Sequence, residues 1–100
     1  MKTFSNFAEF YPYYLAEHDN ITCRRLHFAG SWLVILSVLM ALVTANTWWL
    51  VLAPIGGYGF AWIGHFFYEH NKPATFQYPL YSLRGDWKMF ADILSGKVKI

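Results

Sequence analysis

The sequence has little charge and almost no cysteine. Only 14% of its 100 residues are charged, compared with about 25% in an average soluble chain. The single cysteine, Cys23, excludes an internal disulfide and a zinc site built from several cysteines. The net charge of +2 is too small, and the Lys and Arg residues are too scattered, for a nucleic-acid-binding surface. The 56% share of hydrophobic residues excludes intrinsic disorder, because so much apolar surface must be buried.

Charge is absent altogether from the middle of the chain. Residues 26–68 contain no Lys, Arg, Asp or Glu. One membrane-spanning helix needs about 20 apolar residues, so this stretch predicts two spans, over about residues 27–45 and 48–68. A backbone in lipid must satisfy its own hydrogen bonds, which favours helices. We therefore expect residues 1–100 to form one all-α integral membrane domain, a two-span helical hairpin. The alternative is a buried helical hairpin in a soluble protein.

The two segments that flank the hairpin have amphipathic patterns. In residues 4–18 and 78–95, large apolar side chains recur at helical spacing and most charged residues lie off that stripe. We expect both segments to form amphipathic helices, which either lie at the cytoplasmic interface or simply pack on the hairpin. Positive charge lies on the outer flanks and not at the turn, so the positive-inside rule places both termini in the cytoplasm. The membrane is then the bacterial inner membrane, or the endoplasmic reticulum if the protein is eukaryotic.

Three of the four histidines are expected to converge. His27 opens the first span and His65 nearly closes the second, each beside a stripe of small residues. Small residues mark helix contacts in membranes, so both rings should face the partner helix at one depth. His18 can reach them if Asp19 or Asn20 caps a new helix. The expected stripes are Gly30, Ser37, Ala41 and Thr44 in the first span and Ala53, Gly57, Ala61 and Gly64 in the second.

A carboxylate accompanies these histidines. Glu69 follows His65 by four residues, which places both on the same face of an α-helix. His70 would join the group only if the helix ends or bends there, so His70 is a doubtful ligand. Histidines with a carboxylate and open coordination positions suit non-haem Fe(II), and His-rich sites also suit Zn. Ionisable side chains in or beside membrane spans are costly, and they indicate function.

Three segments of the chain resemble a known membrane family. They are EHDN at 17–20, RLHFAG at 25–30 and GHFFYEHNKPATFQYPLYSLRGD at 64–86. The family was long labelled a domain of unknown function, and it includes the fungal endoplasmic-reticulum 2-hydroxy fatty acid dioxygenase of phytosphingosine breakdown. The resemblance covers most of the chain, from about Phe4 to Asp92.

The resemblance implies a chemistry and a set of site residues. It implies an Fe2+-dependent α-oxidation in which a long-chain 2-hydroxy fatty acid reacts with O2 and becomes one carbon shorter. Glu69 would bind the metal or orient a ligand, and Asn71 and Pro73 match the downstream motif. The residues to which the resemblance assigns metal and catalytic roles are His18, His27, His65 and Glu69.

The expected partners are the fatty acid, O2 and membrane lipid. The apolar spans would hold the acyl chain, and the substrate head group would lie level with the histidines. The residues expected to meet that head group are Arg24, Arg25, Asn71 and Lys72. Two other functions stay open at this point. One is a b-type haem or other metal-binding protein with His27 and His65 as ligands. The other is a non-catalytic module whose small-residue faces form a homodimer.

Overall fold

The regular structure of the protein is entirely helical. The computed structural model describes residues 4–72 and 77–100, and within these ranges it contains no strand, which confirms the expected all-α class. Elements η1 and η2 are a 3₁₀-helix and a π-helix that extend α3 at its two ends. The elements in order are α1 (Phe7–Ala16), α2 (Ile21–Thr44), η1 (Thr47–Val51), α3 (Leu52–Ile63), η2 (Gly64–Glu69) and α4 (Pro79–Leu94).

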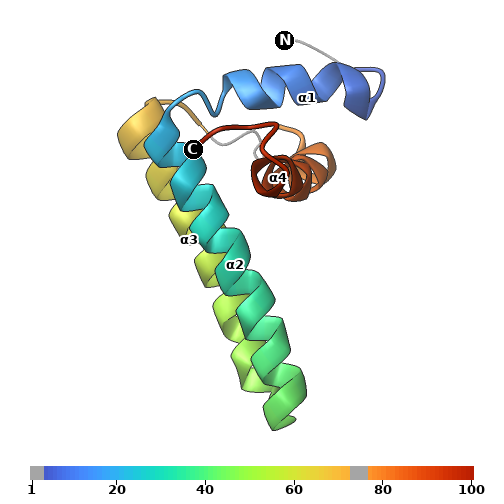
Figure 1. Ribbon diagram of the computed structural model, residues 1–100, viewed down its shortest axis with the longest axis vertical. Helices are drawn as coiled ribbons and strands as arrows, with labels where there is room; N and C mark the ends of the chain where they lie inside the picture. Colours follow the sequence, from blue (N-terminus) through green and yellow to red (C-terminus); the bar gives the residue numbers. More distant parts are fainter. Residues whose placement is uncertain (1–3, 73–76) are drawn as a thin grey trace.

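Helix α2 and the continuous segment from η1 to η2 form a long antiparallel hairpin (Figure 1). The side chain of Asn20 caps α2 by accepting hydrogen bonds from the backbone N–H groups of Thr22 and Cys23, so the helix begins ahead of its apolar part. Ala45 ends it in the left-handed conformation, with φ 53°. Both arms of the hairpin are long and apolar enough to cross a membrane.

The two arms touch through small residues. A Cβ atom at Gly30 would lie 2.8 Å from the carbonyl oxygen of Gly56, so the two backbones are in direct contact. The expected stripe on the second arm is largely present: Ala61 and Gly64 are buried, and a Cβ atom at Gly57 would lie 3.3 Å from Cγ2 of Val34 on α2. Thr44, expected on the first stripe, is exposed.

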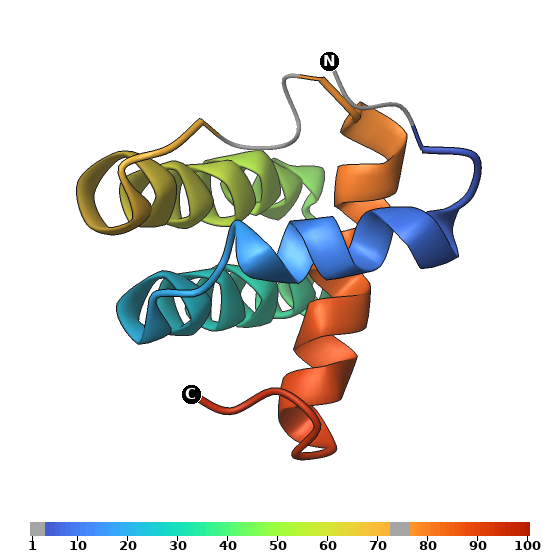
Figure 2. The ribbon, with the colours of Figure 1, turned by 90° about the horizontal axis from the view of Figure 1, so that it is seen from above.

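Helices α1 and α4 gather at one end of the hairpin, where α4 runs across the long helices and α1 crosses α4 (Figure 2). Two bonds between tyrosine and aspartate join them: the Tyr11 hydroxyl donates to Oδ2 of Asp92 at 2.8 Å, and the Tyr14 hydroxyl donates to Oδ1 of Asp86. Gly85 allows the close approach, because a Cβ atom there would lie 2.9 Å from the Tyr14 ring. The buried core between these elements consists of Phe7, Phe10, Tyr11, Tyr14, Met89 and Val98.

A buried serine on α4 gives a first prediction. The Ser82 hydroxyl has no hydrogen-bond partner among the described residues, although Ser82 is only 2% exposed. An unpaired buried hydroxyl destabilises a fold, and Ala is the better helix former. We therefore expect Ser82→Ala to stabilise the protein by about 1 kcal/mol in a thermal unfolding measurement in detergent.

The matched control is Ser37, which is equally buried but donates a hydrogen bond to the carbonyl oxygen of Leu33 at 2.7 Å. Because Ser37→Ala removes a made bond, it should lack this gain. A lower melting temperature for Ser82→Ala than for the unchanged protein would mean that the hydroxyl does have a partner.

Candidate metal centre

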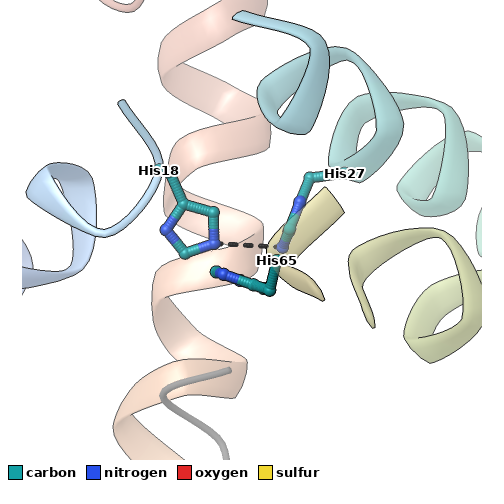
Figure 3. A group of neighbouring side chains, drawn as sticks. All are labelled: His18, His27 and His65. Carbon is teal, nitrogen blue, oxygen red and sulfur yellow. Dashed lines mark hydrogen bonds between the residues drawn. The ribbon is translucent and has the colours of Figure 1, made fainter. Parts of the chain in front are cut away.

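Three histidine rings from three separate segments point toward one another at the α1–α4 end of the hairpin (Figure 3). His18 lies between α1 and α2, His27 on α2, and His65 on η2. The Nε2 atoms of His18 and His27 are 3.0 Å apart, and one ligand atom from each of the three rings lies within 4.8 Å of the others. All three side chains are buried. The expected convergence of these histidines is therefore present in the fold.

The second nitrogen of each ring determines its tautomer. Each Nδ1 lies within hydrogen-bond distance of a carbonyl oxygen, which only accepts, so each Nδ1 carries a proton and, in the neutral ring, each Nε2 keeps a lone pair. The three contacts are His18 to the Tyr14 backbone oxygen at 2.6 Å, His27 to the Cys23 backbone oxygen at 2.9 Å, and His65 to Oδ1 of Asn71 at 2.7 Å.

This arrangement fits a bound cation. Burial holds the pKa of His18 well below its usual value, and the neighbouring imidazoles of His27 and His65 lower it further, which favours the neutral ring. The Nε2 lone pairs of His18 and His27 therefore face each other at 3.0 Å with no proton between them. A metal ion shared by these nitrogens would satisfy both lone pairs, and neutral imidazole is a common metal ligand. A set of three imidazoles suits Zn, Fe and other first-row metals.

Asn71 holds the third ring in place. His70 adopts the left-handed conformation, with φ 58°, and this turns Asn71 back so that its backbone N–H donates to the His65 carbonyl oxygen at 3.0 Å. The Asn71 amide group donates to Oε2 of Glu17 at 2.6 Å and to the Glu17 backbone oxygen at 3.1 Å, which fixes Oδ1 toward His65. Asn71, expected at the substrate, thus lies in this structure between His65 and Glu17 and contacts both.

Glu69 and His70 do not join the three rings. Among the described residues, the side chains that gather as potential ligands here are the three histidines. Glu69 instead accepts a hydrogen bond from the backbone N–H of Asn20. Residues from Gly64 to Glu69 are π-helical, and the Glu69 carboxylate at the end of this segment turns to the start of α2. His70 is exposed and serves as the turn residue.

The three cationic side chains expected to meet the substrate, Arg24, Arg25 and Lys72, differ in their contacts. Nε of Arg24 donates to the His18 backbone oxygen at 2.6 Å, and Nη1 donates to the Lys99 backbone oxygen at 3.2 Å. This guanidinium group therefore ties the His18 loop and the C-terminal segment to α2. Arg25 and Lys72 are exposed. Pro73, the last residue of the motif carried over, lies outside the described residues.

A cavity of about 270 Å³ opens beside the histidines, between α2, α3 and α4. His27 lines one part of it, and apolar or small residues such as Val34, Gly57 and Trp87 line much of the rest. Asp86 also lines it, and burial raises the pKa of that carboxyl to about 6 against the lowering effect of its Tyr14 hydrogen bond.

The sequence interpretation missed both Asp86 and Tyr14. Asp86 closes the third segment that carries the family resemblance, which was the available signal for it. Tyr14 had no comparable signal, since it was assigned only to the apolar stripe of an amphipathic helix. Its ring stacks on the His18 ring, with centroids 4.1 Å apart and planes at 25°.

Loss of the Asn71 side chain tests the support of the third ring. We expect Asn71→Ala to lower metal affinity about 10- to 100-fold without unfolding the protein, because His65 loses the acceptor that fixes its tautomer and orientation. Metal titration with competing chelators measures this. The control is Asn46→Ala: Asn46 caps η1 at the far end of the hairpin by accepting from Trp48 N–H, and its loss should leave metal affinity unchanged. Equal losses in both variants would mean that the Asn71 effect is general destabilisation.

Comparison with known proteins agrees with this geometry. The family model described as "2-hydroxy-palmitic acid dioxygenase Mpo1-like" matches residues 4–98. Neither the curated proteins nor the solved structures contain a match. The matched range includes all three buried histidines and nearly the whole chain, and the chain therefore belongs to the Mpo1-like family.

Proposed function

We propose that this protein is a non-haem Fe(II) dioxygenase of the membrane that shortens long-chain 2-hydroxy fatty acids by one carbon. The observation that carries the proposal is the convergence of three buried imidazoles whose Nδ1 atoms are all committed to carbonyl oxygens. The family description, which names a 2-hydroxy-palmitic acid dioxygenase, supports the reaction class. The cavity beside His27 supports a substrate with an apolar tail.

The residues of the chain would bind and orient the reactants. His18, His27 and His65 would hold the iron, and three protein ligands leave positions open for a 2-hydroxy acid and O2. When bound, iron would supply the redox chemistry that activates O2 beside the C1–C2 bond. Exposed Arg25 and Lys72 would attract the substrate carboxylate toward the cluster.

Glu69 would act through the fold. Its carboxylate accepts a hydrogen bond from the backbone N–H of Asn20, the residue that caps α2. This bond links η2 to the start of the helix that carries His27. The proposed role is to keep His27 and His65 in register, as a positioning residue and not a metal ligand.

The proposed setting is a membrane crossed by both arms of the hairpin. Many of the apolar side chains that do not face the partner arm are exposed, for example Leu42 at 76% and Val43 at 73%, and lipid is the environment that accepts such surfaces. Helices α1 and α4 would then lie at the cytoplasmic interface with both termini on that side.

The geometry does not favour the haem alternative. A macrocycle held by His27 and His65 must lie between the two rings. Their centroids are 5.0 Å apart, and the His18 ring lies 4.4 Å from each of them. A purified protein without a Soret band would agree with this.

The deciding experiment combines metal analysis with turnover. Protein purified in detergent without oxygen, then loaded with Fe(II), should hold about one iron per chain and consume O2 with 2-hydroxyhexadecanoate, giving pentadecanoate. Zinc-loaded protein serves as the control, because zinc has no redox chemistry. Iron-loaded protein that leaves 2-hydroxyhexadecanoate unchanged would refute the proposed reaction.

A further inference from the structure

Asp86 contributes a carboxyl group to the wall of the cavity beside the histidines. Among the described residues that line this cavity, Asp86 is the only one with a carboxyl group, and His27 of the cluster lines the same cavity. Its Oδ1 atom accepts a hydrogen bond from the Tyr14 hydroxyl. The described residues supply no partner for Oδ2, and the side chain is half-buried and lines the cavity. One acceptor oxygen is therefore available to a molecule that enters.

Tyr14 fixes this carboxyl group relative to the metal centre. The same residue stacks its ring on His18 at 4.1 Å, accepts a hydrogen bond from His18 Nδ1 through its backbone oxygen, and donates from its hydroxyl to Asp86. Gly85, the neighbour of Asp86, leaves the space that the Tyr14 ring needs. A single side chain thus links a proposed metal ligand to the acceptor in the cavity.

The chemistry of the proposed substrate matches this acceptor. A 2-hydroxy acid differs from an ordinary fatty acid by one hydroxyl group on C2, which brings one hydrogen-bond donor. A site built to pair with a substrate hydroxyl discriminates strongly against the analogue that lacks it, because a desolvated protein group is then left without a partner. The metal ligands alone cannot provide this contrast by a hydrogen bond, because all three Nδ1 protons are already used within the protein.

We propose that Asp86 recognises the C2 hydroxyl group of the fatty acid by accepting its hydrogen bond, with Tyr14 holding the carboxyl in position. The inference rests on the proposed function for the identity of the substrate. The C2 hydroxyl of the substrate donates a hydrogen bond to Oδ2 of Asp86, and the acyl chain follows the apolar wall of the cavity past Val34 and Gly57.

The chain contains a matched control. Asp92 is a second aspartate on α4, and it too accepts a hydrogen bond from a tyrosine of α1, Tyr11. It does not line the cavity. If the bond between Tyr14 and Asp86 only fastens α1 to α4, substitutions at Asp86 and Asp92 should have the same consequences.

The test compares ligand binding by Asp86→Asn and Asp92→Asn in metal-free protein held in detergent. An asparagine keeps an acceptor for the tyrosine hydroxyl but replaces the free oxygen with an amide donor. The measured quantity is the ratio of the dissociation constants for hexadecanoate and 2-hydroxyhexadecanoate. We expect the unchanged protein to prefer the hydroxy acid at least about tenfold, Asp86→Asn to lose this preference, and Asp92→Asn to keep it.

Asp86→Leu provides a second variant that carries no polar atom at all, and it should also lose the preference. A preference retained in Asp86→Asn, an equal loss in Asp92→Asn, or equal binding of both acids by the unchanged protein would overturn the assignment.

Turnover separates this inference from the proposed function. Selective binding that depends on Asp86, together with iron-loaded protein that consumes no O2, would refute the dioxygenase and leave the recognition role standing. Oxygen consumption by Asp86→Asn with an unchanged KM and an unchanged preference for the hydroxy acid would refute the recognition role alone.

Discussion

Replacing any one of His18, His27 or His65 with alanine is expected to abolish stoichiometric metal binding and to lower turnover by more than about 100-fold. Each ring contributes one Nε2 lone pair to a common centre, so its loss leaves two imidazoles and an incomplete ligand set. Removal of a group that only supports a ligand already costs about 10- to 100-fold, and removal of the ligand itself should cost more. Elemental analysis and O2 uptake of the three variants measure the two effects.

The fourth histidine supplies the control for this series. His70 is exposed and left-handed, and asparagine tolerates that backbone conformation. His70→Asn should therefore keep both metal and turnover. Full metal occupancy in any of the three alanine variants, or metal loss in His70→Asn, would contradict the three-histidine centre.

Enlarging Gly30 is expected to have the largest effect on stability. A methyl group there would meet the carbonyl oxygen of Gly56 at 2.8 Å, and a backbone atom cannot move aside as a side chain can. We expect Gly30→Ala to destabilise the protein by about 1–3 kcal/mol, as overpacking commonly does. Because His27 lies one turn before Gly30 on α2, metal affinity should fall as well. Thermal unfolding in detergent and chelator competition measure both.

Gly59 is the matched position on α3, since a methyl group there would have no atom within 4 Å. Gly59→Ala should be neutral or stabilising, because Ala is favoured over Gly in a helix by about 1 kcal/mol. Equal destabilisation of the two variants would mean that the close contact at Gly30 is not the cause.

Much of this fold could be predicted from local sequence patterns. The absence of charge over residues 26–68 predicted the helical hairpin, and the turn at Asn20 predicted how His18 could reach His27. Both predictions rest on local composition and on the spacing of residues along a helix, and both of these can be read directly from the sequence.

The contacts that the sequence did not predict depend on geometry that a fixed period does not contain. Glu69 was expected to bind the metal or orient a histidine, and its carboxylate accepts a hydrogen bond from Asn20, a contact between η2 and the start of α2. The pairing of Tyr14 with Asp86 joins two helices that are far apart in the sequence, and no spacing rule connects them. The bonds of Asn71 to His65 and Glu17 could not be predicted, because they arise only once the chain turns at His70.

Because the three histidine rings come from three separate segments, the supply of the metal would affect the stability of the protein and therefore its abundance. A metal that binds only the folded chain acts as a cross-link between the loop before α2, α2 itself and η2, and a concentration 100 times its dissociation constant adds about 2.7 kcal/mol of stability. Chains made during metal starvation would lack this cross-link. Quality-control proteases remove destabilised proteins, so scarcity of the metal would reduce the number of molecules as well as the activity of each one.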